Sequence, residues 1–383
     1  MIKLRISQLL LALLLCNPLY SQSKLRVFGH MTQGFAISDH HQIYGIPSKG
    51  TSDYQNIALQ FRFDVNESSN FIVQLTHKRL GLNPLMEITR DIELDWGFFE
   101  HRPTPSSYIK FGKVSLPLGI FNEVRDVGVL IPFYRVPSSV YTESRFSSEA
   151  IEGVVFGIQF PIGKGWSIRS DFFAGQFRWG EWANIENPLG NGFKTNVQRV
   201  DIESVLGTQL WLNTPLEGLR TGISGYYGVT KNGFGLNVLS GVENPTVGNY
   251  LASFEYDFDA AVFRAEGNII AVSGSPFYLQ NYYLQSSFNL WNNFVLNAQF
   301  ESIDSKNIIV PFYLREILPK RHVDSELHRD YSIGLNYIFS AGFVMKLEAH
   351  TTRGLLYEDV FVNPYLDKPL KTNFVILSLA TGF

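Results

Sequence analysis

The sequence predicts an all-β fold, an antiparallel up-and-down β-barrel of about sixteen strands that spans a membrane. Three observations predict it: apolar residues alternate with polar ones along most of the chain, the connections alternate between short and long, and no segment carries an apolar stripe with helical spacing. The alternation is clearest in NIALQFRFDV at residues 56–65. A period of two indicates a β-strand with one apolar face.

The strands follow from this alternation in chain order. They are expected at residues 25–36, 54–65, 70–79, 91–100, 107–113, 149–160, 166–177, 198–212, 218–229, 249–258, 261–272, 279–290, 294–302, 327–339, 343–353 and 371–383. Aromatic residues gather on the apolar faces near the short connections, among them Trp96, Phe98, Trp166, Tyr256 and Phe339. Short turns at one end, long loops at the other and aromatic girdles are typical of an outer-membrane barrel. A soluble β-sandwich is the alternative, and it explains neither arrangement.

The composition excludes other classes of protein. The chain has 383 residues, of which 17% are charged and 14% are aromatic, whereas a disordered chain lacks aromatics and carries excess charge. The longest apolar run, from Leu9 to Cys16, is far too short for a membrane-spanning helix. Acidic residues outnumber Lys and Arg by 35 to 32, which argues against nucleic acid as a partner.

Residues 1–21 are expected to form a cleaved signal peptide, leaving one domain over residues 22–383. Lys3 and Arg5 precede an apolar stretch, Leu9 to Leu15, and Ser21 is a suitable small residue at the cleavage point, with Ser23 as the second choice. The only cysteine, Cys16, would leave with this segment. Thiolate chemistry and a disulfide are then excluded from the mature chain, and no metal site or other cofactor is expected.

A sheet in a bilayer must close, because an open edge would leave backbone polar groups unpaired in hydrocarbon. Sixteen strands enclose a lumen wide enough for water. The polar faces of the strands should line it, and acids outnumber bases there. The expected pore-wall residues are Arg62, Asp95, Lys110, Arg169, Asp201, Arg220, Glu255, Arg264, Glu301 and Lys346.

The connection at residues 114–148 is unusually long and unusually apolar. Phe121, Ile131 and Val140 require burial, so the segment is expected to fold into the barrel with its apolar side on the wall. A loop folded over the outer rim is the alternative. Opposed charges at a narrow point set ion preference. The expected constriction residues are Glu123, Arg125, Asp126, Arg135, Glu143 and Arg145.

The whole mature chain resembles a Gram-negative outer-membrane porin of the sixteen-stranded, usually trimeric class. The signal peptide, the strand count, the long segment after the fifth strand and the final strand FVILSLATGF carry this likeness. The terminal Phe383 is similar to the barrel-assembly signal of the class. The resemblance implies an outer-membrane location, a homotrimer, passive diffusion of small hydrophilic solutes, and contact with lipid, lipopolysaccharide and the barrel-assembly machinery.

Residues 108–126, YIKFGKVSLPLGIFNEVRD, are also similar to a segment of phosphate-selective porins. Those members are implied to use a strongly basic pore, whereas this wall is acidic on balance. The sequence therefore predicts a general or weakly cation-preferring pore.

Two other classes of function remain open. A receptor or adhesin would bind partners through outer loops such as 178–197 and 354–370, which carry aromatic residues. A barrel hydrolase needs a converging Ser and His, and His350 with Glu348 shares one face while His328 with Asp330 shares another. No G-x-S-x-G motif is present, so no enzyme activity is expected. The adjacent His40 and His41 lack further ligand spacing for a metal.

Overall fold

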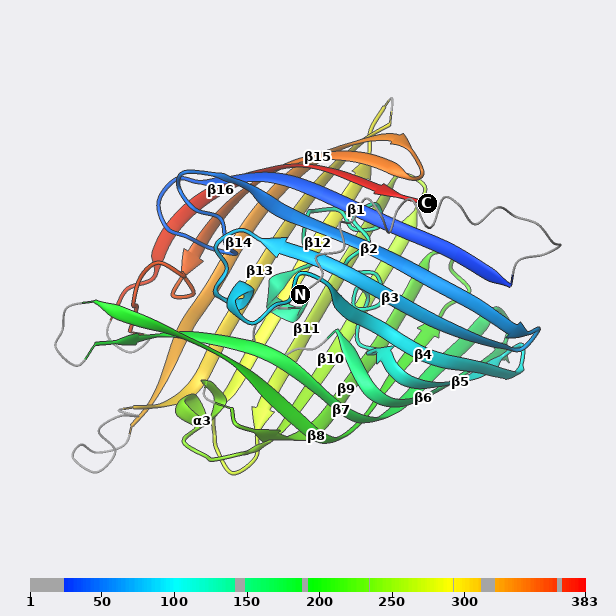
Figure 1. The fold of residues 1–383 in the computed structure, drawn as a ribbon, viewed down its shortest axis with the longest axis horizontal. Helices are drawn as coiled ribbons and strands as arrows, with labels where there is room; N and C mark the ends of the chain where they lie inside the picture. Colours follow the sequence, from blue (N-terminus) through cyan, green and yellow to red (C-terminus); the bar gives the residue numbers. More distant parts are fainter. Residues whose placement is uncertain are drawn as a thin grey trace, which may run out of the picture.

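The computed structural model describes residues 24–141, 149–187, 192–233, 235–291, 293–310, 321–363 and 367–383. Within these ranges the chain forms a closed barrel in which every strand pairs antiparallel with its sequence neighbours and β1 pairs with β16 (Figure 1). The predicted all-β, sixteen-stranded, up-and-down barrel is confirmed. The predicted signal peptide lies outside the described residues.

The strands run as follows: β1 Leu25–Ser38, β2 Thr51–Asn66, β3 Ser69–Leu80, β4 Glu93–Thr104, β5 Ser107–Ser115, β6 Ala150–Gly163, β7 Trp166–Glu186, β8 Phe193–Asn213, β9 Leu219–Lys231, β10 Thr246–Phe258, β11 Ala261–Val272, β12 Tyr278–Asn289, β13 Phe294–Val310, β14 Arg321–Ser340, β15 Phe343–Gly354 and β16 Leu370–Gly382. In the described part of the chain, three short helices lie in the connections between strands, η1 Pro84–Glu87, α2 Ser138–Tyr141 and α3 Gly235–Ser240. None of the helices in the described part is long and apolar enough to cross a membrane.

Burial alternates along most of the strands and separates two faces. In β15, Met345, Leu347 and Ala349 are exposed, while Lys346, Glu348 and His350 between them are buried. The apolar side chains therefore point outward and the polar ones inward, the reverse of a soluble protein. This arrangement suits a barrel with lipid outside and polar contents inside.

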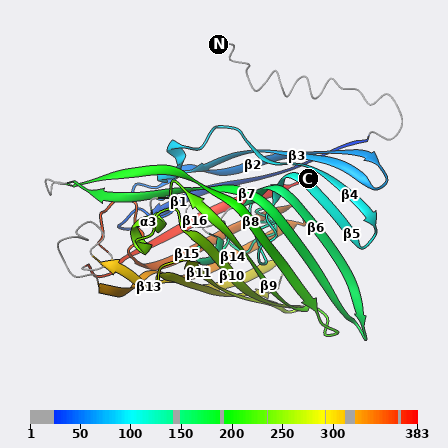
Figure 2. The same cartoon turned by 90° about the horizontal axis from the view of Figure 1, so that it is seen from below.

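The turns at one end of the barrel are short, as expected, but two hairpins at the other end are longer than the alternation predicts. Strand β7 continues to Glu186 and β8 begins at Phe193. Likewise, β13 continues to Val310 and β14 begins at Arg321. Figure 2 shows the β7–β8 hairpin running past its neighbours. The expected loop at 178–197 is thus mostly strand. Polar residues cover both faces of these extensions, so the apolar alternation that marks a strand is missing there.

Two β-bulges reverse which face a side chain occupies. Ser204 has a positive φ of 54° and the β8–β9 register shifts between Glu203 and Leu206, so Val200 and Ile202 point inward and Asp201 points outward. Asp201 is therefore not a pore-wall residue. The β3–β4 register shifts between Gln74 and Leu75.

The register shift at β4 also corrects the position expected for Phe98. Phe98 packs in an internal apolar cluster with Trp96 against it, rather than on the outer girdle. An unbroken alternation cannot reveal a bulge, because one extra residue moves every later side chain to the other face.

Candidate functional site: the inserted segment and the side window

The connection between β5 and β6 leaves the wall, and its described part, residues 116–141, contacts the inner face of the barrel. Lys346 Nζ donates to the carbonyl oxygens of Ile131 and Phe133, at 2.7 and 2.9 Å. The carboxylate of Glu348 accepts from the backbone N–H of Tyr134 at 2.7 Å. Both wall residues point into the barrel from β15, so this part of the segment lies against the inside of the wall.

Two further wall carboxylates hold other parts of the segment. Glu266 of β11 accepts from the backbone N–H of Ile120 at 2.9 Å and from the Tyr141 hydroxyl. Glu301 of β13 accepts from the backbone N–H of Ser139 at 2.7 Å. We call Glu266, Glu301, Lys346 and Glu348 the wall anchors. Because all four are buried, their charges satisfy backbone groups of the segment instead of facing water.

The apolar side of the segment packs with inward-facing apolar residues of the wall. Phe121, Ile131 and Val140 belong to one buried cluster that also includes Phe173 and Tyr226 from the strands. Leu130 is exposed. The free energy gained by burying this apolar side offsets the conformational entropy that is lost when a long connection becomes ordered.

The expected constriction residues have different environments. Arg125 is buried and donates to the carbonyl oxygen of Tyr141 at 2.6 Å, so it stabilises the segment rather than facing a passage. Asp126 accepts from Lys78 Nζ at 2.9 Å, and Glu123 lies 3.6 Å from Arg169. The Arg135 guanidinium covers the ring of Tyr44. Glu143 and Arg145 lie outside the described residues.

The expected pore-wall residues other than Asp201 point into the barrel, where most form pairs. Arg62 pairs with Asp64, Arg169 with Asp171, and both Arg220 and Arg264 with Glu255; Asp95 accepts from Gln74, and Lys110 lies over the rings of Phe98 and Tyr108. Glu301 and Lys346 are wall anchors. Arg62, Arg169 and Arg220 are about one-third exposed, so water reaches the inner face at their level.

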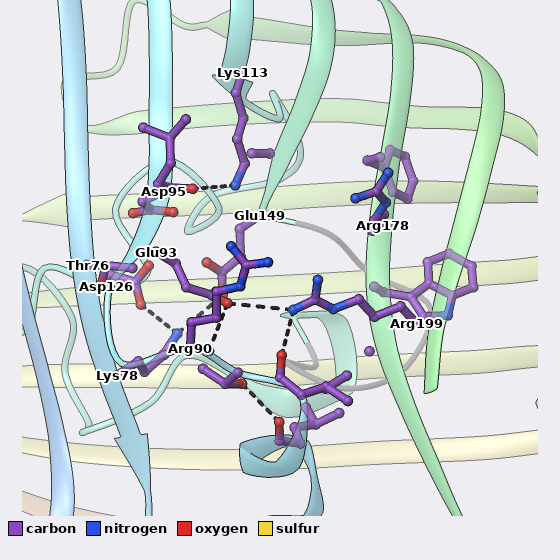
Figure 3. A pocket seen from close by; sticks show the side chains of 18 of the residues that line it. Thr76, Lys78, Arg90, Glu93, Asp95, Lys113, Asp126, Glu149, Arg178 and Arg199 are labelled. Carbon is purple, nitrogen blue, oxygen red and sulfur yellow. Dashed lines mark hydrogen bonds and ion pairs between the residues drawn. The ribbon is translucent and has the colours of Figure 1, made fainter. Parts of the chain in front are cut away.

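A gap in the wall forms above the ends of β4, β5 and β6, because the chain leaves the sheet there. It contains a cavity of about 470 Å³ that we call the side window (Figure 3). The strand β3, the β3–β4 connection and the long hairpin β7–β8 frame it. Arg199 of β8 donates to the carbonyl oxygen of Ile88 at 2.5 Å, which ties the connection to the hairpin across the top.

The side window is lined by five basic and five acidic side chains. These are Lys78, Arg90, Lys113, Arg178 and Arg199, and Glu93, Asp95, Asp126, Glu149 and Glu152. Carboxylate oxygens of Asp95, Asp126 and Glu149 lie within 4.8 Å of one another, a grouping that suits a cation. Lys78 donates to Asp126 and Glu149, and Arg125 lies 3.5 Å from Glu149, so protein cations supply the counter-charge.

Sequence reasoning missed the window because it depends on contacts between distant segments. Arg90 comes from the connection between β3 and β4, whereas Arg199 lies near the start of the predicted strand at 198–212, and only the fold brings them together. The one available signal is the charged run TRDIE at residues 89–93, which separates β3 from β4. Charge runs of this kind also occur on solvated loops, so the run alone does not identify a site.

The histidine candidates are engaged in structural contacts. His350 Nδ1 lies 3.0 Å from Asp330 and its Nε2 lies 3.2 Å from Glu348, both buried. His328 lies 2.9 Å from the Tyr44 hydroxyl. His40 contacts Asp39, and His41 lies 3.7 Å from Asp359. The His350 cluster lies behind the inserted segment and beside the wall anchors.

Comparisons with known proteins show the fold. No protein-family model matches the chain, and no curated protein matches it by sequence. Solved outer-membrane proteins do match. OmpT of Vibrio cholerae has a TM-score of 0.58 at 12% identity over 95% of this chain and 99% of its own. OmpF of Salmonella typhi, in complex with daunomycin, has a TM-score of 0.57 at 10% identity over 94% and 97%.

The outer membrane channel DcaP of Acinetobacter baumannii gives a TM-score of 0.56 at 10% identity, over 94% of this chain and 97% of its own. These alignments span nearly the full length of each partner, so the likeness extends over the whole barrel. The chain therefore has the barrel architecture found in outer-membrane proteins, at identities that show the fold alone.

Proposed function

We propose that this protein is an outer-membrane channel for the passive diffusion of small hydrophilic solutes. One observation carries the proposal: the barrel is closed, apolar outside and charged inside. An apolar exterior requires lipid, and a closed sheet meets the hydrogen-bonding needs of the backbone there. Arginines that are about one-third exposed on the inner face and a charged cavity in the wall require water. The similarity to OmpF and DcaP supports the same function.

In this proposal the inserted segment narrows the lumen and the charged residues that still face water select among ions. Arg62, Arg169, Arg220 and Glu123 serve this role in the lumen, and the charges of the side window serve it at the gap in the wall. Acids and bases are balanced in the window, which favours a general pore over a phosphate-selective one. The excess of acids along the inner faces of the strands adds a weak cation preference. No catalytic role is proposed for the His350 cluster.

We extend the proposal to assembly and location. A leader at residues 1–21 would direct the chain through the inner membrane to the outer membrane of a Gram-negative bacterium. Phe383 would mark the final strand for the assembly machinery, and lipid with lipopolysaccharide would surround the barrel. A trimer form of OmpT of Vibrio cholerae matches this chain with a TM-score of 0.51 at 12% identity, which supports a homotrimer.

Single-channel recording of the detergent-purified mature protein in a planar bilayer under a salt gradient tests the function. Stable conductance steps with a slightly cation-selective reversal potential are expected. A folded barrel that conducts nothing would contradict the proposal. It would favour a receptor, for which the β7–β8 and β13–β14 hairpins offer long outer surfaces.

A further inference from the structure

Four outer segments are joined to one another across the open end of the barrel. Glu358, in the connection between β15 and β16, is buried and accepts from the backbone N–H of Gly45 at 2.7 Å, from Gln42 at 3.0 Å and from Asn83 at 3.0 Å. Asn184, near the tip of β7, donates to the carbonyl oxygen of Val360 at 2.6 Å. Since β7 and β16 lie on nearly opposite sides of the ring, these contacts span the mouth. We call them the roof.

The side window crosses the wall at a level below the roof. Lys113, Glu152 and Arg178 belong to the outer face, because their neighbours Val114, Ile151 and Phe177 are buried inside. Lys78 and Asp95 belong to the inner face. All five line the same cavity, so side chains from both faces of the wall meet in it.

The outer face changes character at the window. Below it, Phe111, Phe156 and Leu206 are exposed apolar residues of the lipid-facing band. At the window and above it, Glu152, Arg178 and Asp201 are charged, and Arg178 pairs with Asp201 at 2.6 Å. The window therefore opens at the aqueous border of the band, where a water-soluble molecule can reach it.

The window presents charges of both signs. Figure 3 shows Asp95 and Asp126 on the β3–β4 side, with Lys78 and Lys113 beside them, and Arg178 and Arg199 on the β7–β8 side. The exposed guanidinium of Arg90 has no ion pair among the described residues. Opposite charges across a cavity orient a solute that carries both signs, and a volume of about 470 Å³ suits a small molecule.

We propose that the side window is a lateral entrance to the lumen for small dipolar ions, molecules that carry both an ammonium and a carboxylate group. The inference rests on the proposed channel function and specifies its route and its solute class. A solute enters between β3 and the β7–β8 hairpin, passes the Asp95, Asp126 and Glu149 cluster, and reaches the charged inner face. The roof contacts need not break during transport.

Cysteine labelling of the channel tests the route, since the proposed mature barrel lacks cysteine. Arg90→Cys introduces a thiol in the window, and Glu87→Cys places one on the same connection away from the cavity. A bulky thiol reagent is expected to reduce the conductance of the first variant by about half or more and to leave the second unchanged. A third protein, with Asn184→Cys and Val360→Cys tied by a short bifunctional thiol reagent, fixes the roof and should conduct like the untreated protein.

Loss of conductance in the tied roof, or full conductance in labelled Arg90→Cys, would overturn the lateral route while leaving the channel function intact. An untreated protein that conducts nothing would overturn the channel function itself and this inference with it. The solute class is tested by swelling of proteoliposomes in glycine and in glycolamide, its uncharged isomer. Glycine should enter at least about twofold faster, and equal rates would overturn the proposed class.

Discussion

The wall anchors and the side window use the same residue types in opposite ways. At the wall anchors, Glu266, Glu301, Lys346 and Glu348 are sealed beneath the inserted segment and bond to its backbone. At the side window, acids and bases of the same kinds line a cavity that water can enter. Inward-facing charge is therefore not sufficient evidence of a pore-lining role. The difference lies in what covers the side chain, and each prediction below probes one side of that comparison.

The largest effect is expected from Lys346→Met. This substitution removes the donor to the carbonyl oxygens of Ile131 and Phe133 and leaves both without a partner from the wall. Each buried group that loses its hydrogen-bond partner costs about 1–3 kcal/mol, so two such losses amount to about 2–6 kcal/mol. Urea unfolding of the reconstituted barrel, followed by tryptophan fluorescence, measures the change. The exposed Lys371→Met on β16 is the control and should shift the unfolding free energy by less than about 0.5 kcal/mol.

A smaller loss is expected from Glu266→Gln, which keeps the shape of the side chain and removes its charge. The bond from the backbone of Ile120 is weakened, and the amide must reorganise its contacts with Tyr141, Ser253 and Tyr283. A destabilisation of about 1–3 kcal/mol follows. Amide hydrogen exchange at Ile120 should accelerate, whereas Glu217→Gln in a short turn should leave it unchanged. Unaltered exchange in Glu266→Gln would show that this anchor does not hold the segment.

A charge reversal in the side window is expected to change the ion selectivity of the channel without lowering its stability. Arg90→Glu changes an exposed charge with no ion pair in the described part of the chain, so the unfolding free energy should move by less than about 0.5 kcal/mol. The reversal potential in a salt gradient should shift toward cations. Lys346→Met provides the contrast, because Lys346 is buried beneath the inserted segment, and its loss should reduce stability and leave the reversal potential near that of the unmodified protein. A loss of stability in the window variant, together with a shifted reversal potential in the buried variant, would contradict the roles assigned to the two regions.

The smallest effect on the unfolding free energy is expected from Asp39→Asn, at the outer end of the seam between β1 and β16. Burial opposes ionisation, but hydrogen bonds from Asn373, His40 and Thr372 together outweigh it and hold the pKa of Asp39 well below its usual range. Its stabilising contribution is therefore complete above about pH 4, the usual value for an unfolded Asp, and disappears as the pH falls through the folded pKa. The difference in unfolding free energy between Asp39→Asn and the unmodified protein should be constant from pH 7 to about pH 4 and narrow below it.

The sequence was sufficient to predict the barrel, because apolar and polar residues alternate with a period of two in the strands that cross lipid. It failed at the extensions of β7 and β13, where polar and apolar residues occur on both faces and the alternation is lost, and at Ser204, where a bulge turns Asp201 outward. Burial of the apolar residues Phe121, Ile131 and Val140 was also predictable from their composition. The wall anchors Glu266 and Glu348 were not, because a charged residue on an inner face has the same local pattern whether a distant segment covers it or not.

The seam between β1 and β16 has a consequence for biogenesis. Phe383 exchanges backbone hydrogen bonds with Gly29, and its ring lies over that glycine, where a Cβ would approach it to 2.7 Å. The ring of strands thus closes by pairing its first strand with its last. Closure cannot occur until β16 has been made, and the pairing with the greatest sequence separation is also the one that removes both exposed edges. Until then the chain has two unpaired edges and must be shielded from aggregation while it travels to its membrane.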